Sequence, residues 1–304
     1  MNYSIYKLCF RSPVHFGSGR LSSGTDHFYA DTLFSAFCHE AIKLYGENGA
    51  EKMYQLVKDG KLLLSDSMPY YKNELYIPKP IAVVEGKRQS DSSMKKKFKK
   101  LKYIPVGDIS DFFSGSYVPS DALNELGSSH IRSCAAVKRD DDAEPFNIGV
   151  FTFKKDYGLY FIVGTDSDEA YDIVSDIMDS LSYTGIGGKL SSGMGKFSYT
   201  YESASAEWLS LLESSSSSLY MSLSLSMAAD DELERVIENA SFELIKRSGF
   251  IASSNDGQTQ KKQDLYCFRG GSCFREKFRG DIFDVSAGFG HPVYRYCVPM
   301  MIGI

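Results

Sequence analysis

A glycine-rich segment, residues 183–197, has the residue types best suited to binding an anion. It reads Tyr-Thr-Gly-Ile-Gly-Gly-Lys-Leu-Ser-Ser-Gly-Met-Gly-Lys-Phe and combines five glycines with two lysines and two adjacent serines. Glycine permits φ > 0 and close approach of another backbone, and successive turned N–H groups form concave anion sites. The segment is therefore a candidate phosphate loop. A long connection without a ligand fits the same pattern.

Two well-known phosphate loops do not fit this segment. The P-loop requires Ser or Thr after Gly-Lys, but Gly195-Lys196 is followed by Phe197, and position 190 is not glycine. The dinucleotide-binding pattern fails because Gly185-Ile186-Gly187 is followed three residues later by Leu190. The segment also precedes a predicted strand instead of opening a helix. Nucleotide hydrolysis and dinucleotide chemistry are not predicted.

The composition is that of an ordinary globular protein. Of 304 residues, 43% are hydrophobic and 24% are charged, and the net charge of −5 means that any nucleic-acid surface must be local. The six cysteines contain no C-x-x-C pair and no paired His/Cys spacing, so no zinc, other metal or cofactor is expected. We interpret them as small buried thiols in a reducing cytosol, with disulfides as the alternative.

The chain has no predicted membrane segment. No apolar run approaches the roughly 18 residues that a membrane span requires. The N-terminus, Met1-Asn2-Tyr3-Ser4, lacks the pattern of a signal peptide. The sequence therefore predicts a cytoplasmic protein.

The apolar periodicity predicts the order strand, helix, strand, strand, helix, strand in the first two thirds of the chain. This is the ferredoxin-like pattern. The expected strands are 3–11, 62–64, 159–163 and 196–201, and the expected helices begin near Asp31 and Asp166 and end near Gly46 and Leu181.

A large insertion, about residues 80–150, interrupts this pattern. Glu85–Lys102 is lysine-rich, and we expect an exposed, mobile insertion that only Phe98 and Leu101 could anchor. Residues 131–137 and 146–153 flank a polar stretch and predict an extended β-hairpin.

A second unit is predicted after the serine-rich linker Ser214–Ser218. Residues 219–227 alternate apolar residues with mostly serines, which indicates a strand, and Asp230–Asn239 is a candidate acidic helix. The fold class we predict is α+β, with two tandem ferredoxin-like (RRM-like) domains. The first covers 1–203 and includes the insertion, and the second covers 204–304.

The sequence carries no recognisable catalytic signature, and no catalytic residue is predicted. His15 and His27 flank the Gly17–Gly24 loop, where a histidine could act as a general acid or base on a ribose or bind a phosphate. His39 falls on the first helix beside Cys38, and a structural role fits it.

RNA binding is the function that the loops favour. The first unit would place residues 17–20 and the glycine-rich segment near strand ends, where N–H groups and lysines could converge on an RNA backbone. Phe16 and Tyr183 are candidate stacking partners for bases. Residues 246–295 carry nine Lys/Arg against five Asp/Glu, which predicts a local positive surface, or else ordinary intramolecular pairs.

Several stretches, spread over nearly the whole chain, together resemble one family. They are Phe16–Arg20, the helix start Ala30–Ala36, Lys100–Pro105, Pro145–Gly149, Gly185–Phe197 and His291–Tyr296. Together they are similar to the subunit-four family of the Csm complex, the repeat-associated (RAMP) proteins of type III-A CRISPR–Cas interference. Many RAMP proteins share the glycine loop, whereas its combination with His-Pro-Val-Tyr-Arg-Tyr near the C-terminus is specific.

The resemblance implies a non-catalytic subunit that binds and caps the 5′ repeat-derived tag of the CRISPR RNA. It also implies contacts with the large Palm-domain subunit and with the backbone RAMP subunit of the filament. A β-hairpin thumb of the family kinks the guide, and we match it to Arg132–Phe153. The acidic tip Asp140–Asp142 departs from that role, and Glu85–Lys102 is the alternative RNA-facing insertion.

The RNA-binding candidates come from three places. The two loops and the terminal motif are carried over from the family, and the arginines lie at the base and shoulder of the hairpin. The candidates are His15, Ser18, Gly19, Arg20, Arg132, Arg139, Gly187, Gly188, Lys189, Ser191, Ser192, Gly193, Lys196, Tyr294 and Arg295.

Two other functions stay open on the sequence. The first is a RAMP endoribonuclease that processes precursor CRISPR RNA, with His15 or His39 as general acid/base. The second is an assembly adaptor that docks through the apolar residues 298–304 without contacting RNA. The end of a core strand is the more ordinary explanation of that apolar segment.

Overall fold

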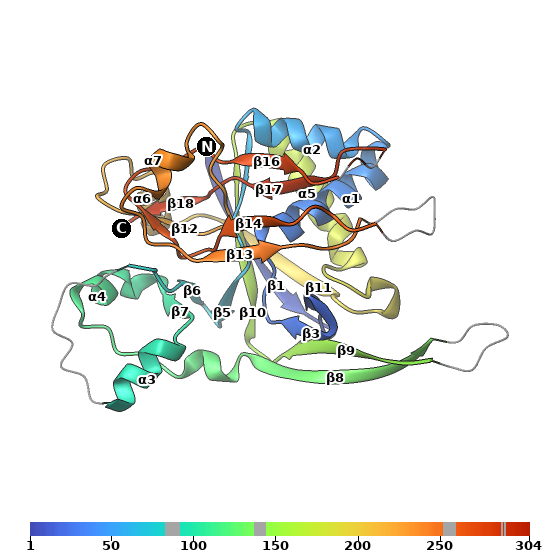
Figure 1. Ribbon diagram of the computed structural model, residues 1–304. Coiled ribbons are helices and arrows are strands. Elements are labelled where there is room, and N and C mark those ends of the chain that lie inside the picture. Colours follow the sequence, from blue (N-terminus) through green and yellow to red (C-terminus); the bar gives the residue numbers. More distant parts are fainter. Residues whose placement is uncertain (83–91, 137–143, 252–259, 287, 289) are drawn as a thin grey trace.

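A seven-stranded sheet organises the first two thirds of the chain (Figure 1). The computed structural model describes residues 1–82, 92–136, 144–251, 260–286, 288 and 290–304. The strand order is β11-β1-β10-β5-β6-β7, and β4 also pairs with β10. The strands are β1 (Asn2–Phe10), β4 (Leu62–Leu64), β5 (Met68–Tyr71), β6 (Glu74–Pro78), β7 (Tyr103–Pro105), β10 (Tyr157–Thr165) and β11 (Phe197–Ser203).

Two long helices pack on this sheet. Helix α1 (Ala30–Tyr45) ends at Gly46, which adopts φ 82° and donates its N–H to the carbonyl of Ile42. Helix α5 (Asp168–Thr184) begins after Ser167, whose hydroxyl accepts a hydrogen bond from the N–H of Ala170. The predicted order of strands and helices is thus present in β1, α1, β4, β10, α5 and β11. The sequence missed α2 (Gly49–Lys58), which follows α1.

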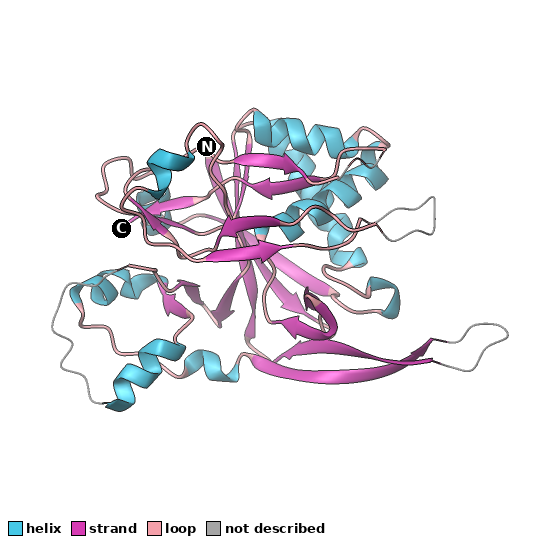
Figure 2. Ribbon diagram, in the orientation of Figure 1, coloured by secondary structure: helices cyan, strands magenta, loops and turns pink. Residues whose placement is uncertain are grey.

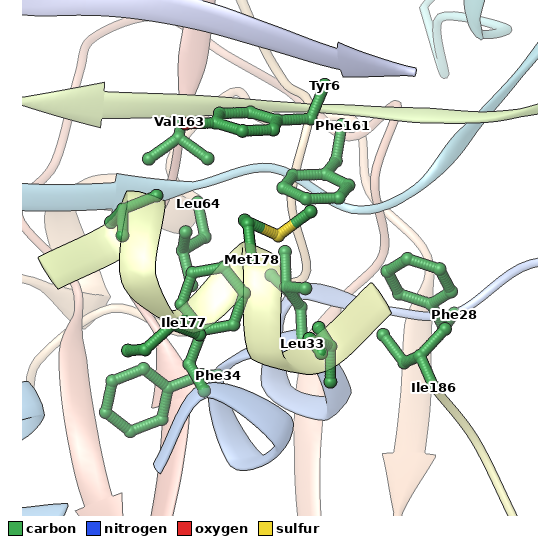
Figure 3. Close-up of a cluster of buried hydrophobic side chains, with 14 of the residues drawn as sticks. Tyr6, Phe28, Leu33, Phe34, Leu64, Phe161, Val163, Ile177, Met178 and Ile186 are labelled. Carbon is green, nitrogen blue, oxygen red and sulfur yellow. The ribbon is translucent and has the colours of Figure 1, made fainter. Parts of the chain in front are cut away.

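The apolar faces of α1 and α5 form the main core with the sheet (Figure 3). The apolar side chains that the two helices contribute to this core are almost fully buried. On the sheet, the ring of Tyr6 in β1 stacks on the ring of Phe161 in β10. Burying such side chains contributes about 1.5–3 kcal/mol each. The set includes Leu33, Phe34, Phe37, Ile173, Val174, Ile177 and Met178.

The insertion contains a long β-hairpin. Strands β8 (Gly127–Ala136) and β9 (Glu144–Phe153) pair in one unbroken register and project from the body (Figure 1). This confirms the predicted hairpin, whose acidic tip Asp140–Asp142 lies outside the described residues. Short elements precede it: α3 (Ser92–Lys100), the 3₁₀ helices η1 (Val106–Asp108) and η2 (Ala122–Glu125), and α4 (Ile109–Ser114).

The lysine-rich run, expected to be an exposed, mobile insertion, has exposed lysines and is helical in its described part. Residues 92–100 form helix α3, and Phe98 and Leu101 pack against the second core cluster. The two apolar side chains named as possible anchors therefore serve as anchors, and the lysines occupy the outer face. Residues 83–91, the first part of the predicted insertion, lie outside the described residues.

The last third of the chain consists mainly of short strands (Figure 2). They pair as β15-β12-β18, β13-β14 and β16-β17. A complete ferredoxin-like unit needs two helices between its strands, whereas the described part of 219–304 contains one helix of five residues, α7. The second domain and its boundary at 204 therefore stay predictions. The elements are α6 (Ala206–Leu212), β12 (Tyr220–Ser222), α7 (Leu233–Ile237), β13 (Leu244–Arg247), β14 (Leu265–Phe268), β15 (Cys273–Phe274), β16 (Asp281–Asp284), β17 (Tyr294–Cys297) and β18 (Met301–Gly303).

The alternating serine segment makes a shorter strand than predicted. Only Tyr220–Ser222 forms β12, and the alternate serines are buried instead of facing solvent. The hydroxyl of Ser222 donates to the carbonyl of Ser224, and that of Ser224 accepts from the N–H of Met300. These bonds satisfy the serines inside the protein, so both faces of the segment can be buried.

The two halves of the chain share one core. Tyr296 of β17 is fully buried against α1, and its hydroxyl accepts a hydrogen bond from the N–H of Leu64 at 2.9 Å. At the C-terminus β18 pairs with β12, and Met300 and Ile302 are buried. This confirms the core-strand explanation of residues 298–304 and removes the exposed apolar surface that an adaptor would need.

The cysteines are all free thiols. Cys267, Cys273 and Cys297 are buried as predicted, and Cys38 and Cys134 are half-buried. Cys9 is exposed, so the prediction was wrong for it. It faces outward because the two flanking residues of β1, Leu8 and Phe10, take the inward positions on this alternating strand.

Candidate RNA-binding site

The glycine-rich segment folds into a closed loop between α5 and β11. The N–H of Ile186 donates to the carbonyl of Gly195 at 3.1 Å, which joins the two ends of the loop. Gly185, Gly187 and Gly195 have φ of 92°, 105° and 74°. A Cβ at Gly195 would lie 2.2 Å from the carbonyl oxygen of Ile186. Glycine is therefore required here by both conformation and space.

The closed loop packs directly on the first candidate loop. Gly188 donates its N–H to the carbonyl of His15 at 2.8 Å, and Gly195 donates to the carbonyl of Pro13 at 2.9 Å. The N–H of Lys196 donates to the hydroxyl of Ser12. The convergence of the two loops, predicted from the strand order, is confirmed.

The side chain of His15 joins these loops to the long hairpin. His15 is buried, and its Nδ1 lies 2.7 Å from the carbonyl oxygen of Gly149 on β9. A carbonyl oxygen only accepts, so Nδ1 carries the proton in this contact. Val14 and Phe151 exchange two backbone hydrogen bonds beside this contact. Three predicted RNA-facing segments thus meet at one residue.

A cavity of about 600 Å³ opens between the two loops, α1 and the C-terminal strands. Its walls contain many glycine backbones, together with aromatic and hydroxyl side chains. Seven of the predicted RNA-binding residues line it: His15, Ser18, Gly19, Gly187, Gly188, Tyr294 and Arg295. The cavity therefore collects residues from the first loop, the glycine loop and the C-terminal motif.

The other predicted residues lie around the loops and on the hairpin. Lys189 adopts φ 61°, and its Nζ lies 5.2 Å from the ring centre of Phe146 on β9. The Nζ of Lys196 donates to the carbonyl of Tyr183. Gly193 ends the 3₁₀ helix η3 (Leu190–Ser192) in the left-handed conformation. The exposed candidates are Arg20, Arg132, Ser191, Ser192 and Gly193, and Arg139 lies outside the described residues.

The two proposed stacking residues differ in exposure. Tyr183 is 80% exposed beside the glycine loop, so its ring is open to solvent. Phe16 is 5% exposed and packs edge-on against Phe10 and Phe28 in the core. The prediction for Phe16 was wrong, because the strand β2 (Phe16–Ser18), which pairs with β3 (Arg20–Thr25), turns that ring inward.

A buried charge cluster, formed by Asp31, Arg247 and Arg295, closes one side of the cavity. The Nε of Arg247 donates to Asp31 Oδ2 at 2.9 Å and its Nη2 donates to Oδ1 at 2.8 Å. Arg295 Nη1 donates to the same Oδ2 at 2.6 Å. Burial opposes ionisation of Asp31, but Arg247 and then Arg295 hold its pKa below the usual value. Arg295, predicted to touch RNA, thus also holds the two halves together.

Two more basic side chains face the same cavity. Burial, followed by repulsion from Arg295, lowers the pKa of Lys262. Burial, followed by Lys262 and Lys43, lowers the pKa of His39. Sequence reasoning missed Arg247 and Lys262 as site residues. The excess of basic residues in 246–295 was the signal that pointed toward them.

Tyr294, the first tyrosine of the C-terminal motif, is held by α2. Tyr294 donates its hydroxyl to Glu51 Oε2 at 2.7 Å, and its ring stacks on Tyr54 at 4.4 Å between centres. One face of the ring is therefore occupied within the protein. The cavity meets the remaining edge of this side chain.

The described part of the chain holds no group of three or more His, Cys, Asp or Glu that could bind a metal ion. Among those residues, no helix is long and apolar enough to span a bilayer.

Two protein-family models match this chain, one in its first two thirds and one in its last third. Residues 7–198 match the RAMP superfamily, and residues 215–304 match the CRISPR Csm4 C-terminal domain. A Csm4 protein of Mycobacterium tuberculosis is 34% identical over 100% of this chain and 98% of its own length. A Csm4 protein of Streptococcus thermophilus is 30% identical over 99% of this chain and 98% of its own length.

Solved structures give the same fold. The structure described as a Csm3-Csm4 subcomplex of the type III-A CRISPR-Cas interference complex aligns with a TM-score of 0.72, at 19% identity, over 100% of this chain and 99% of the other. A Csm1-Csm4 cassette in complex with cA4 aligns with a TM-score of 0.64, at 16% identity, over 100% and 98%. Together with the full-length relatives, the paired RAMP and C-terminal domain matches place this chain in the Csm4 family.

Proposed function

We propose that this protein is the subunit of a type III-A Csm effector complex that binds and caps the 5′ tag of the CRISPR RNA. The observation that supports it best is the junction at His15. One residue joins the first loop, the glycine loop and the base of the hairpin through the Gly188–His15 and His15–Gly149 hydrogen bonds. A site with glycine backbone N–H groups, hydroxyls and cations suits phosphates and 2′-hydroxyls.

The hairpin extends this proposed surface. Nearly all of β8 is exposed, including Arg132, so a long strand face is open to a partner. We propose that RNA leaving the loop site runs along this hairpin, and that the hairpin separates the tag from the rest of the guide. Stacking on exposed Tyr183 would add about 1–3 kcal/mol per base.

The proposed partners are a Csm3-type backbone subunit and a Csm1-type large subunit. The fold matches Csm4 chains whose structures are described as Csm3-Csm4 and Csm1-Csm4 assemblies. The lysines of helix α3 are exposed, whereas Phe98 and Leu101 pack against the second core cluster and anchor the helix. The exposed lysines form a positively charged surface that could contact a partner. We further propose the α+β description with a second, reduced ferredoxin-like unit at 204–304.

We propose that the chain itself does not cleave RNA. His15 uses Nδ1 to hold the hairpin, and its role in joining three segments accounts for its burial without catalysis. The competing endoribonuclease requires His15 Nε2 or His39 to reach a ribose in the cavity that both residues line. Cleavage of repeat RNA in EDTA, lost in a His15→Ala variant, would favour that enzyme instead.

Binding of end-labelled 5′-tag RNA over a range of salt tests the proposal. A Lys189→Ala/Lys196→Ala variant should bind more weakly, and its slope of log K against log [salt] should fall by about 1.4, or 0.7 for each lost phosphate contact. Lys52→Ala/Lys58→Ala is the matched control. It removes the same charge from α2, where the two lysines pair with Glu169 and Asp281 and belong to neither loop. Equal affinity and slope in both variants would refute the loop assignment.

A further inference from the structure

We propose that the cavity beside the glycine loop is a built phosphate site, and that Lys262 and the Nε of Arg295 are the groups that bind one phosphate of the tag RNA. This inference rests on the proposed function. It adds Lys262, which sequence reasoning did not select, and gives the predicted Arg295 a specific contact. It depends on three observations within the described chain: an excess of positive charge at the cavity, a buried unsatisfied donor beside an unpaired lysine, and an enclosed space next to the RNA loops.

The charge around the cavity does not balance. Arg247, Arg295 and Lys262 all lie at its C-terminal wall, while Asp31 is the carboxylate that pairs with both arginines. The nearby Asp66 is fully buried, which raises its pKa to about 7, so it is largely protonated below that pH. Buried charges without a counterion are costly, and a phosphate supplies the missing negative charge.

Two donors in this wall have no acceptor among the described residues. Arg295 is 5% exposed and lines the cavity, yet its Nε is buried with no hydrogen-bond partner. Lys262 lines the same cavity, and within the described chain its ammonium group forms neither an ion pair nor a side-chain hydrogen bond. Buried donors are almost always satisfied in native proteins, so the unsatisfied Nε of Arg295, with the half-buried ammonium of Lys262 that is unpaired among these residues at the same cavity, points to an anion.

The position of the cavity identifies the source of the anion. The opposite wall is made of His15, Gly17, Gly187 and Gly188, at the proposed binding site for the tag. The cavity volume of about 600 Å³ accommodates a nucleotide, and Ser18 and Thr32 contribute hydroxyls to its walls. RNA held by the loops could therefore place one phosphate against the C-terminal wall.

Lys262→Met is the variant that separates binding from stability. Burial disfavours the charged form of Lys262, so replacing it with an apolar side chain of similar length should leave the free protein as stable or more stable. Affinity for 5′-tag RNA should fall about 10- to 100-fold, the usual effect of losing one hydrogen bond between charged groups. The salt slope should fall by about 0.7.

Lys261→Met is the matched control. Lys261 is the neighbouring residue, so this substitution removes the same charge. Lys261 is exposed, does not line the cavity, and its Nζ lies 3.1 Å from Asp264 Oδ2. Wild type and both variants are compared by tag RNA titration and by thermal unfolding with and without inorganic phosphate. Phosphate should raise the melting temperature of wild type and of the control but not of Lys262→Met.

Each result bears on one of the two proposals. Tag binding that is equal in both variants refutes the phosphate site and leaves the loop assignment intact. Destabilisation by Lys262→Met in the free protein also refutes it, because Lys262 would then be a structural residue.

Failure of the wild-type chain to bind tag RNA refutes the proposed function. In that case a phosphate effect lost only in Lys262→Met supports the anion site itself, and the absence of any phosphate effect refutes it.

Discussion

Gly195→Ala should disrupt the glycine loop more than any other single methyl group added to it. Gly195 has φ 74°, where a side chain costs about 1–2 kcal/mol. The new Cβ would also lie 2.2 Å from the carbonyl oxygen of Ile186, so the backbone must move. That movement breaks the hydrogen bond between Ile186 N–H and the Gly195 carbonyl, which contributes about 0.5–1.5 kcal/mol. The total is about 1.5–3.5 kcal/mol.

Gly193→Ala in the same loop provides the comparison. Gly193 has a similar φ, 79°, but no atom lies within 4 Å of its added Cβ. Its cost should therefore be the strain of the left-handed conformation alone, about 1–2 kcal/mol. Urea unfolding of wild type and both variants gives the two free-energy changes. The same samples, titrated with tag RNA, should show the larger loss of affinity for Gly195→Ala.

Unfolding of the two alanine variants at the same urea concentration would contradict the larger cost predicted for Gly195→Ala. That result would mean that the loop relaxes around Gly195 without losing its closing hydrogen bond. Unchanged tag affinity in a clearly destabilised Gly195→Ala protein would separate the closed loop from RNA binding.

Three further predictions concern the cluster beside the cavity and the exposed ring. Asp31→Asn should destabilise the protein by about 3–5 kcal/mol in urea at pH 7, because both arginines stay buried without their carboxylate; a change below 1 kcal/mol would contradict the pairing. Asp66→Asn keeps the oxygen that accepts from Ala30 and Leu225. Because burial raises the pKa of Asp66 from 3.8 to about 7, wild type loses stability as pH rises across this range, so the variant should gain on wild type between about pH 4 and pH 7; a constant difference would refute this. Tyr183→Ala should weaken tag binding about 5- to 100-fold at unchanged melting temperature, whereas Tyr183→Phe should not.

Local sequence patterns were sufficient to predict most elements of the first unit. The alternation in β1, the glycine that ends α1 and the paired runs of β8 and β9 all depend on neighbouring residues, and each was predicted. The meeting of the two loops also followed, because the strand order brings Pro13–His15 and Gly185–Lys196 to adjacent strand ends. Local signals suffice where an element depends on its own periodicity.

The remaining features depend on contacts between distant residues. Asp31 and Arg247 are 216 positions apart, and no local pattern indicates that they pair. The serines of 222–226 look solvent-facing by alternation, but Ser222 donates to the carbonyl of Ser224, and Ser224 bonds to backbone groups of Val298 and Met300 inside the core. Phe16 precedes the candidate RNA-binding loop 17–20 in sequence, yet its ring is buried in the core. In each case tertiary packing overrides the local pattern.

Mapping the contact between the RNA and the chain tests the central claim most directly. Tag RNA carrying a photoreactive base is crosslinked to the wild-type protein, and the crosslinked peptides are identified by mass spectrometry. We predict crosslinks in residues 15–20 and 183–196, with the non-tag end of the RNA reaching the β8–β9 hairpin. Crosslinks confined to α3, with none in the two loops, would contradict the account.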